Sequence, residues 1–272
     1  MDRHVIEALG KARVVIKDGK VIEVGKPEVE YCPLFAKVRN IQVITPDIIR
    51  ENIEFRIRDF GMCTPQRKLR MRDFLSFGVS ELMMTAVQKG MLDAVVIVCE
   101  GAGTVVVSDP ELIQGIGGRI SGIVETSPIP EIIEAIGEDN VLDPEQARID
   151  QYEGTRLALV KGFKRVGVSV ASGNDARRIR DEFGQRVALF AVHTTGRSKE
   201  DADLFFDNCD IITACASSAV RTRAKERALL QVGNKVPIYA ASLWGEILLK
   251  ERLAQIKHPN ITSPEEPPRP LL

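Results

Sequence analysis

The chain has 272 residues, of which 44% are hydrophobic and 28% charged, enough apolar content for one large domain or two modest ones with a real core. Lys and Arg (37) nearly balance Asp and Glu (38), so the net charge of −1 gives no global reason to expect nucleic acid or an anionic membrane as a partner. No apolar run reaches membrane-spanning length and no secretory signal pattern opens the chain, so we expect a cytoplasmic protein.

The first half predicts a mixed α/β region that begins with a β-hairpin. Residues 12–25, ARVVIKDGKVIEVG, form two alternating apolar runs around Asp18-Gly19, a pair that type I′ turns favour. A helix is expected to begin at Pro46 after the cap residue Thr45. A second helix, over residues 80–90, precedes a buried strand over residues 92–100. We assign residues 1–150 to this region.

The loop after the first of these helices holds the first candidate for chemistry, Cys63. In the segment RIRDFGMCTPQRKLRMR, residues 56–72, six Arg and Lys residues flank this cysteine, Arg56 and Arg58 among them. Cationic neighbours favour the thiolate, which attacks electrophiles and ligates metals. The alternative is that the basic residues form a solvated face and that Cys63 is an incidental loop thiol.

The five cysteines, at positions 32, 63, 99, 209 and 215, are typical of reduced thiols and not of an extracellular disulfide framework. No CxxC pair occurs, so the zinc-ribbon and ferredoxin spacings are absent. Cys32 and Cys63 both lie near proline in loop-like segments and are the candidate ligands for a metal or an iron–sulfur cluster. Cys99 ends an apolar run and is expected to be buried in a strand.

Two glycine-rich segments are candidate cofactor-binding loops. Gly101 and Gly103 follow a predicted strand directly, and Gly117 and Gly118 belong to the second segment. Glycines at such places let the backbone approach a phosphate or a ring, such as that of a flavin. However, TVVV follows GAG where a dinucleotide-binding fingerprint would have a helix. A hairpin turn is therefore the alternative for the first segment.

The second half, residues 151–256, alternates strands and helices. Short apolar strands near FKRVGVSVA, RVALFAVH, CDIITACA and VPIYAA are separated by helices near NDARRIRDEFG, SKEDADLFFDN and AVRTRAKERALL. This alternation predicts a Rossmann-like, mainly parallel sheet with helices on its faces. The fold class is therefore α/β.

Ligands of such sheets gather at the carboxyl ends of the strands. Small polar side chains follow those ends here, and the candidate ligand contacts among them are Ser172, Thr194, Thr195 and Ser217. His193 is placed at this rim, whereas His4 lies at the terminus and His258 in the tail. It is a candidate acid, base or anion contact, or else it bonds a neighbouring backbone group.

Cys215, in the segment TACASS, is the third candidate catalytic residue. It could be a nucleophile whose pKa is lowered by a helix amino terminus, or a small buried residue. The remaining residues, 257–272, are rich in proline and predict an extended arm that lies on the domain or on a partner.

Several segments, in order along the chain, carry a family resemblance: YCPLF, NIEFRIRDFGMCTP, DFLSFGVSE, DAVVIVCEGAGTVVVSDPELIQGIGGR, FAVHTTG, TACAS, ERALLQVG and the closing PLL. Together they resemble the methanogenesis marker protein 8 family of archaeal methanogens and close relatives. The resemblance covers nearly the whole chain. It implies an anaerobic archaeal cytoplasm and a role tied to methane metabolism, but no reaction and no catalytic residues.

The segments GVSELMMTAVQKGMLDAVVIVCEGAG and GFKRVGVSVASGNDARRIRDEFG carry a second, weaker likeness. Their order is similar to that in the flavin-bearing beta subunit of the hydrogenase that reduces the deazaflavin coenzyme of methanogens. This chain has SVASGND where that family has a cysteine-rich loop, so the likeness implies shared architecture without the iron–sulfur site.

These patterns leave three functions open. The first is a redox or cofactor-binding protein, whose cysteines hold a metal or whose glycine loops hold a flavin-like anion. The second is an assembly or maturation factor that binds a methanogenesis enzyme through the basic loop and the tail. The third is an enzyme that uses His193 and the polar rim on a small anionic metabolite. The sequence ranks the first ahead of the others and leaves the reaction and the oligomeric state open.

Overall fold

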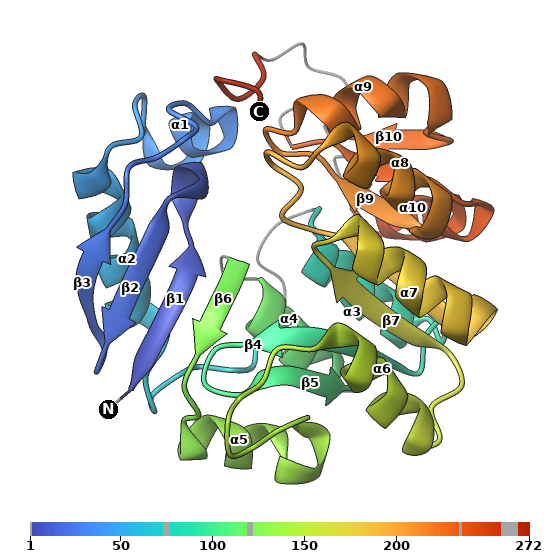
Figure 1. Ribbon diagram of the computed structural model, residues 1–272, viewed down its shortest axis with the longest axis horizontal. Helices are drawn as coiled ribbons and strands as arrows, with labels where there is room; N and C mark the ends of the chain where they lie inside the picture. The colour runs from blue at the N-terminus through green and yellow to red at the C-terminus, as the bar shows by residue number, and fades with distance from the viewer. Residues whose placement is uncertain (1, 73–76, 119–121, 234–235, 257–265) are drawn as a thin grey trace.

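Two β-sheets organise the protein (Figure 1). The computed structural model describes residues 2–72, 77–118, 122–233, 236–256 and 266–272. The smaller sheet is antiparallel, with the strand order β3-β2-β1-β6, and consists of β1 (Arg3–Glu7), β2 (Arg13–Lys17), β3 (Lys20–Val24) and β6 (Gly122–Thr126). Asp18 and Gly19 join β2 to β3 with φ angles of 47° and 70°, which confirms the predicted hairpin and its type I′ turn.

Helices α1 (Pro33–Arg39) and α2 (Pro46–Phe60) complete the region around this sheet. The Thr45 hydroxyl accepts a hydrogen bond from the Ile48 amide at 3.3 Å, so α2 begins where the sequence predicts. Ile49 and Ile53 on its inner face are fully buried and pack in one core with β1, β2 and β3. That apolar stripe is what fixes α2 on the sheet.

The larger sheet has seven strands in the order β10-β11-β9-β8-β7-β4-β5. They are β4 (Ala94–Cys99), β5 (Gly103–Val107), β7 (Val166–Val170), β8 (Val187–Ala191), β9 (Ile211–Thr213), β10 (Leu230–Val232) and β11 (Ile238–Ala240). The four central strands β4, β7, β8 and β9 are parallel, which confirms the predicted α/β class. β11 is antiparallel instead, because a short connection makes it the return strand of a hairpin with β10.

Helices cover both faces of the larger sheet. α3 (Val79–Gln88), α4 (Pro110–Gly117), α5 (Pro130–Ile136) and α10 (Leu243–Gln255) share one core, and α6 (Gln151–Val160), α7 (Gly173–Phe183), α8 (Lys199–Asn208) and α9 (Ser218–Arg227) share the other. Phe190 of β8 belongs to the first core and its neighbour Leu189 to the second. Single 3₁₀ turns occur at Leu9–Lys11, Glu138–Asn140 and Gly184–Arg186.

The first 150 residues contribute strands to both sheets. β4 and β5 join the larger sheet, and β6, which follows them in the chain, pairs with β1. The chain therefore crosses between the sheets more than once, and the carboxyl ends of the parallel strands lie where the two sheets approach each other (Figure 1). No helix in the described part of the chain has both the length and the apolar character needed to span a membrane.

Candidate functional site

Cys63 is buried beside a carboxylate and does not lie among free cations. Its side chain is inaccessible to solvent, and its backbone adopts a left-handed φ of 57°. Burial, and then the negative charge of Glu100, raise the pKa of the Cys63 thiol well above its ordinary value, and Arg67 opposes this only in part. The thiolate-favouring surroundings that the sequence predicts are not found.

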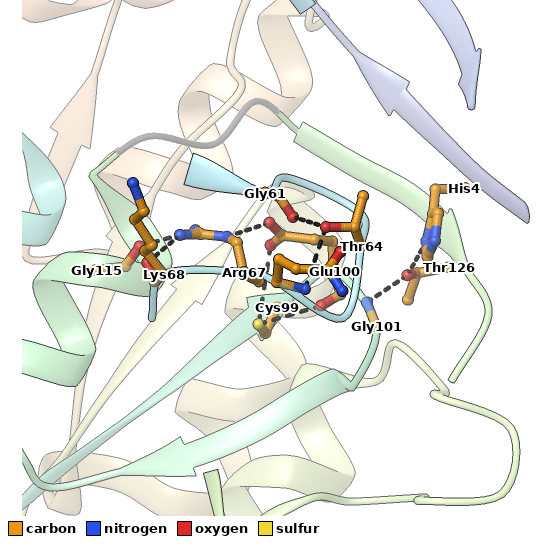
Figure 2. Close-up of polar contacts among 11 residues, drawn as sticks. His4, Gly61, Thr64, Arg67, Lys68, Cys99, Glu100, Gly101, Gly115 and Thr126 are labelled. Atoms are coloured by element: carbon orange, nitrogen blue, oxygen red, sulfur yellow. Dashed lines mark hydrogen bonds and ion pairs between the residues drawn. The ribbon is translucent and has the colours of Figure 1, made fainter. Parts of the chain in front are cut away.

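Arg67, from the basic loop, forms a buried ion pair with Glu100 (Figure 2). Its Nε lies 2.5 Å from Glu100 Oε1, and both side chains are fully buried. The other guanidinium nitrogens donate to the carbonyl oxygens of Lys68 at 2.6 Å and Gly115 at 2.8 Å. We call this group the Arg67–Glu100 centre. It connects the loop that follows α2 to the end of β4 and to α4. The Arg67 nitrogens named above donate to groups of the same chain.

His4 continues this polar cluster towards the smaller sheet (Figure 2). The Thr126 hydroxyl oxygen accepts from the Gly101 amide at 2.7 Å and is hydrogen-bonded to His4 Nδ1 at 2.6 Å. His4 Nε2 then faces the Asp2 carboxylate. Burial lowers the pKa of His4, and Asp2 partly opposes that shift. The sequence places His4 at the terminus, yet it is a buried residue of β1.

The first glycine-rich segment is a β-hairpin turn. Gly101 and Gly103 have φ angles of 79° and 70° and connect β4 to its antiparallel partner β5. A Cβ atom at Gly103 would lie 2.2 Å from the Ala147 carbonyl oxygen, and one at Gly101 would lie 2.8 Å from Ile132. The chain itself fills the space that these glycines open, so the hairpin alternative describes this segment.

A cleft lies instead at the carboxyl ends of the parallel strands. Its first lobe has a volume of about 400 Å³, in the range of small-molecule sites. Residues of β7, residues that follow β8 and the starts of α3 and α6 contribute to its lining. An apolar floor is formed by Val79, Met83, Ile97, Ile113, Ile123 and Ile149. Its polar lining residues are Ser80, Asp150, Gln151, Tyr152, Ser169, Asp175, Arg178 and His193.

The second lobe, of about 420 Å³, shares Ser80, Gly117 and His193 with the first. It extends towards α1 and the smaller sheet, where its charged lining residues are Glu7, Lys11, Arg56 and Glu81. The buried Glu81 carboxylate accepts hydrogen bonds from Ser80 Oγ at 3.0 Å and Gln114 Nε2 at 2.7 Å. We call the two lobes together the cleft. His193 lies where they meet.

The His193 side chain is exposed within the cleft, on a backbone with a left-handed φ of 52°. Such a conformation is uncommon outside glycine and marks a position held by its surroundings. The imidazole packs on Gly122 of β6, where a Cβ atom would lie 3.1 Å from Nδ1. The enclosing walls disfavour the imidazolium, and with the charge of Arg197 they lower the pKa of His193 to about 4.

The ring nitrogens of His193 make no hydrogen bond with a described residue. The alternative that His193 bonds a neighbouring backbone group is therefore not found among the described residues. At neutral pH the imidazole is uncharged and carries one donor and one acceptor towards the cleft.

Arg178 supplies a cation at the first lobe that the sequence analysis missed. Its guanidinium carbon lies 3.6 Å from the centre of the Tyr152 ring, a stacked cation–π contact. Within the described ranges, no carboxylate forms an ion pair with it. From the sequence it is one of several charged residues on an exposed helix face, and only the position of α7 beside the cleft distinguishes it.

The predicted contacts at the strand ends mostly bind the chain itself. Ser172 caps α7 by accepting from the Asp175 amide at 3.4 Å, and Ser217 caps α9 by accepting from the Val220 amide at 3.3 Å. Thr194 donates to the Thr213 carbonyl at 2.6 Å, and Thr195 accepts from the Ala216 amide at 3.3 Å. Both threonines line the second lobe, and the two capping serines do not.

The remaining predicted residues divide between the cleft and the surface. Gly117 lines both lobes, and Gly118 and Arg56 line the second. Burial and the neighbouring Arg39 lower the pKa of Arg56 to about 10, so it is still a cation at neutral pH. Arg58 is exposed and packs near the ring of Phe55.

Cys32 lines the second lobe together with Cys215, and the thiols of these two residues are hydrogen-bonded to each other. This bond is the first cause, before burial, of a Cys215 pKa well above the ordinary value. Among the residues that the structure describes, no three His, Cys, Asp or Glu side chains are arranged to hold a metal ion. The metal site at Cys32 and Cys63 stays a prediction.

The fold and the cleft define an α/β protein with a cavity of small-molecule size at the carboxyl ends of its parallel strands. Residues 4–254 match the family described as "Uncharacterized protein conserved in archaea (DUF2099)", and the chain belongs to this family. One similar protein is the "Uncharacterized protein MJ0054" of Methanocaldococcus jannaschii. It is 45% identical over 260 residues, which cover 93% of this chain and 91% of that protein.

Proposed function

We propose that the protein binds a small molecule with an apolar body and an anionic group in the cleft, and that His193 is the residue that exchanges a proton with it. The observation that carries this proposal is the position of His193. An uncharged imidazole on a constrained backbone projects into the cavity where the two lobes meet, without a hydrogen bond to the described chain.

The lining of the first lobe supports this class of ligand. Its floor is aliphatic, and burying apolar surface there contributes about 25 cal/mol per Å². Arg178 at the edge can bind a carboxylate, sulfonate or phosphate in the planar, bidentate manner that suits guanidinium. The amino end of α7 is a weaker anion site, because the Gly173 amide already donates to Asp201 Oδ1 at 2.8 Å.

His193 fits a role as proton acceptor during binding or reaction. With a pKa of about 4 it is neutral in the empty cleft, and an anion placed beside it favours the imidazolium. Binding therefore raises the pKa of His193 towards neutrality, into the range in which a general acid or base is effective. Occupancy of the cleft and the protonation state of His193 are then coupled.

The other predicted functions draw less support from these contacts. A flavin at Gly101 and Gly103 would compete with Ile129, Ile132 and the 147–148 backbone for the same space. A role in methane metabolism, and the alternative of an assembly factor for a methanogenesis enzyme, rest on the resemblance of the sequence to the methanogenesis marker family. They are compatible with a ligand in the cleft, which would then be a metabolite or cofactor of that metabolism.

A fluorescent probe of the proposed ligand class tests the site. 1-Anilinonaphthalene-8-sulfonate has an apolar aromatic body and one sulfonate, and we expect it to bind the native protein at a single site. Arg178→Gln should weaken binding about tenfold or more, since a charge-assisted hydrogen bond contributes about 1.5–3 kcal/mol. Arg177→Gln is the matched control, because Arg177 is adjacent in α7 but does not line the cleft.

A second variant, Ala171→Phe, fills the first lobe and should abolish binding while near-ultraviolet circular dichroism shows intact packing. Equal affinity in wild type, Arg178→Gln and Ala171→Phe would place the dye elsewhere and reject the site. The role of His193 is tested by calorimetry in two buffers of different ionisation enthalpy. Wild type should take up protons on binding, and His193→Gln should not.

A further inference from the structure

Cys32 and Cys215 lie on opposite walls of the second lobe. Cys32 is the residue before α1, next to the smaller sheet, and Cys215 follows β9 of the larger sheet. Their thiols are nevertheless in hydrogen-bond contact. Cys63, Cys99 and Cys209 are not among the described residues that line this lobe.

The C-terminal segment holds the same two positions together independently of the thiols. Arg269 forms a backbone bridge with Tyr31, donating to its carbonyl at 3.0 Å. Three residues further on, the Leu272 amide donates to the Ala216 carbonyl at 2.8 Å. The neighbours of the two cysteines are thus anchored to one short stretch of chain, which lies between α1 and α9 (Figure 1). Three residues span at most about 10 Å.

We propose that Cys32 and Cys215 are a dithiol site that forms a reversible disulfide with a low-molecular-weight disulfide as oxidant, linking the walls of the second lobe. Two cysteines of a folded chain can form a disulfide only where their side chains approach each other, and the shared lobe and the common C-terminal anchor bring these two together. The bond would join the region around the smaller sheet to the larger sheet at the mouth of the cleft. The state of the dithiol then sets whether a covalent bond is added to the C-terminal contacts that hold those walls together.

The reaction balances as two successive exchanges. Cys215, as a thiolate, attacks one sulfur of the oxidant RSSR, which forms a mixed disulfide and releases RS⁻. The Cys32 thiolate then attacks the Cys215 sulfur and releases the second RS⁻. The two thiol protons pass to the leaving groups, so the protein dithiol and RSSR yield the protein disulfide and two RSH. The protein loses two electrons and the oxidant gains them.

Exposure decides the order of the two attacks. Cys215 is partly accessible from the second lobe, whereas Cys32 is only 5% exposed, so Cys215 meets the oxidant first and Cys32 resolves the mixed disulfide. The Cys32 contact and burial keep Cys215 protonated at neutral pH. The exchange rate should therefore rise about tenfold for each pH unit in the neutral range, as the thiolate fraction rises.

The test uses the native, fully reduced protein in buffers of reduced and oxidised glutathione, quenched with N-ethylmaleimide and mapped by mass spectrometry. We expect one crosslinked peptide pair that contains Cys32 and Cys215. In a parallel sample quenched with acid and not alkylated, the intact mass should be lower by about 2 Da because two thiol hydrogens leave. Cys32→Ser should stop at a glutathione adduct on Cys215. Cys209→Ser, which removes a cysteine buried in the core between α8 and the sheet, should crosslink as wild type does.

Separate alkylation of Cys32 and Cys215 at every glutathione ratio would overturn the proposal. So would a crosslink that forms only in denaturant, or an equal loss of mass in Cys32→Ser. Wild type alone decides the first two outcomes, so the test stands even if a variant folds poorly.

Discussion

The Arg67–Glu100 centre and the cleft both place charged side chains between the two sheets, but they differ in what satisfies those charges. In the centre, Arg67 binds Glu100 and two backbone carbonyls of the same chain. In the cleft, Arg178 and His193 line a cavity. Within the described residues, Arg178 forms no ion pair and the His193 ring forms no hydrogen bond. The first arrangement is typical of a structural tie, and the second of a ligand site.

The largest effect that separates the two regions should come from breaking the centre. Arg67→Met leaves Glu100 as an unpaired buried carboxylate, and we expect the free energy of unfolding to fall by about 3–5 kcal/mol. Urea denaturation followed by circular dichroism measures the loss. Dye binding to the folded fraction should be unchanged, because Arg67 and Glu100 do not line the cleft.

Two variants serve as controls for this prediction. Arg70→Met removes a more exposed pair with Asp109 and should cost only about 0–1 kcal/mol. The double variant Arg67→Met/Glu100→Leu should recover much of the loss, since it removes the uncompensated charge. If Arg67→Met were as stable as wild type, the Arg67–Glu100 centre would not contribute to the stability of the fold.

A loss that begins at a lower value is expected at the hairpin that positions Glu100. Gly103→Ala adds a Cβ atom 2.2 Å from the Ala147 carbonyl oxygen, at a φ of 70°. Left-handed strain of about 1–2 kcal/mol and overpacking of about 1–3 kcal/mol give an expected loss of about 2–5 kcal/mol. Gly162→Ala has a similar φ, 93°, but no atom within 4 Å, and should show the strain alone. Equal losses in both variants would contradict the close packing at Gly103.

The regions that the sequence predicts well are those that local patterns specify. The turn at Asp18-Gly19, the cap at Thr45 and the alternation of strands and helices after residue 151 depend on residues a few positions apart. The parallel pairing of β7, β8 and β9 follows from that alternation, because helical crossovers bring consecutive strands side by side.

The long-range partners were not predictable in the same way. Hydrophobic periodicity states that a residue is buried but not what lies beside it, so it could not place Glu100 next to Cys63 or β6 next to β1. A run of basic residues predicts a cationic loop. The carboxylate that pairs with Arg67 of this loop is Glu100, which follows β4 and is distant in the sequence. Arg178 was missed for a related reason, since an exposed helical arginine has no distinguishing local pattern.

The prediction with the smallest effect on stability concerns the two histidines. The folded-state pKa values of His4 and His193 are both lowered, so between the ordinary pKa of 6.5 and the folded value the unfolded chain binds more protons. Stability should therefore fall as pH decreases through this window, and His193→Gln should make the fall less steep. Because His193 is exposed within the cleft, its share is expected to be the minor one.

The same titration distinguishes the centre from the cleft when a ligand is present. Followed by nuclear magnetic resonance of the imidazole protons, the pKa of His193 should start near 4 and rise when 1-anilinonaphthalene-8-sulfonate is bound, because the sulfonate favours the imidazolium. His4 is bonded to Thr126 and faces Asp2, away from the cleft, so its titration should not move. No shift at His193 would mean that the dye does not bind beside it. An equal shift at both histidines would mean that the effect of the dye is not confined to the cleft, and the contrast between the two regions would not hold.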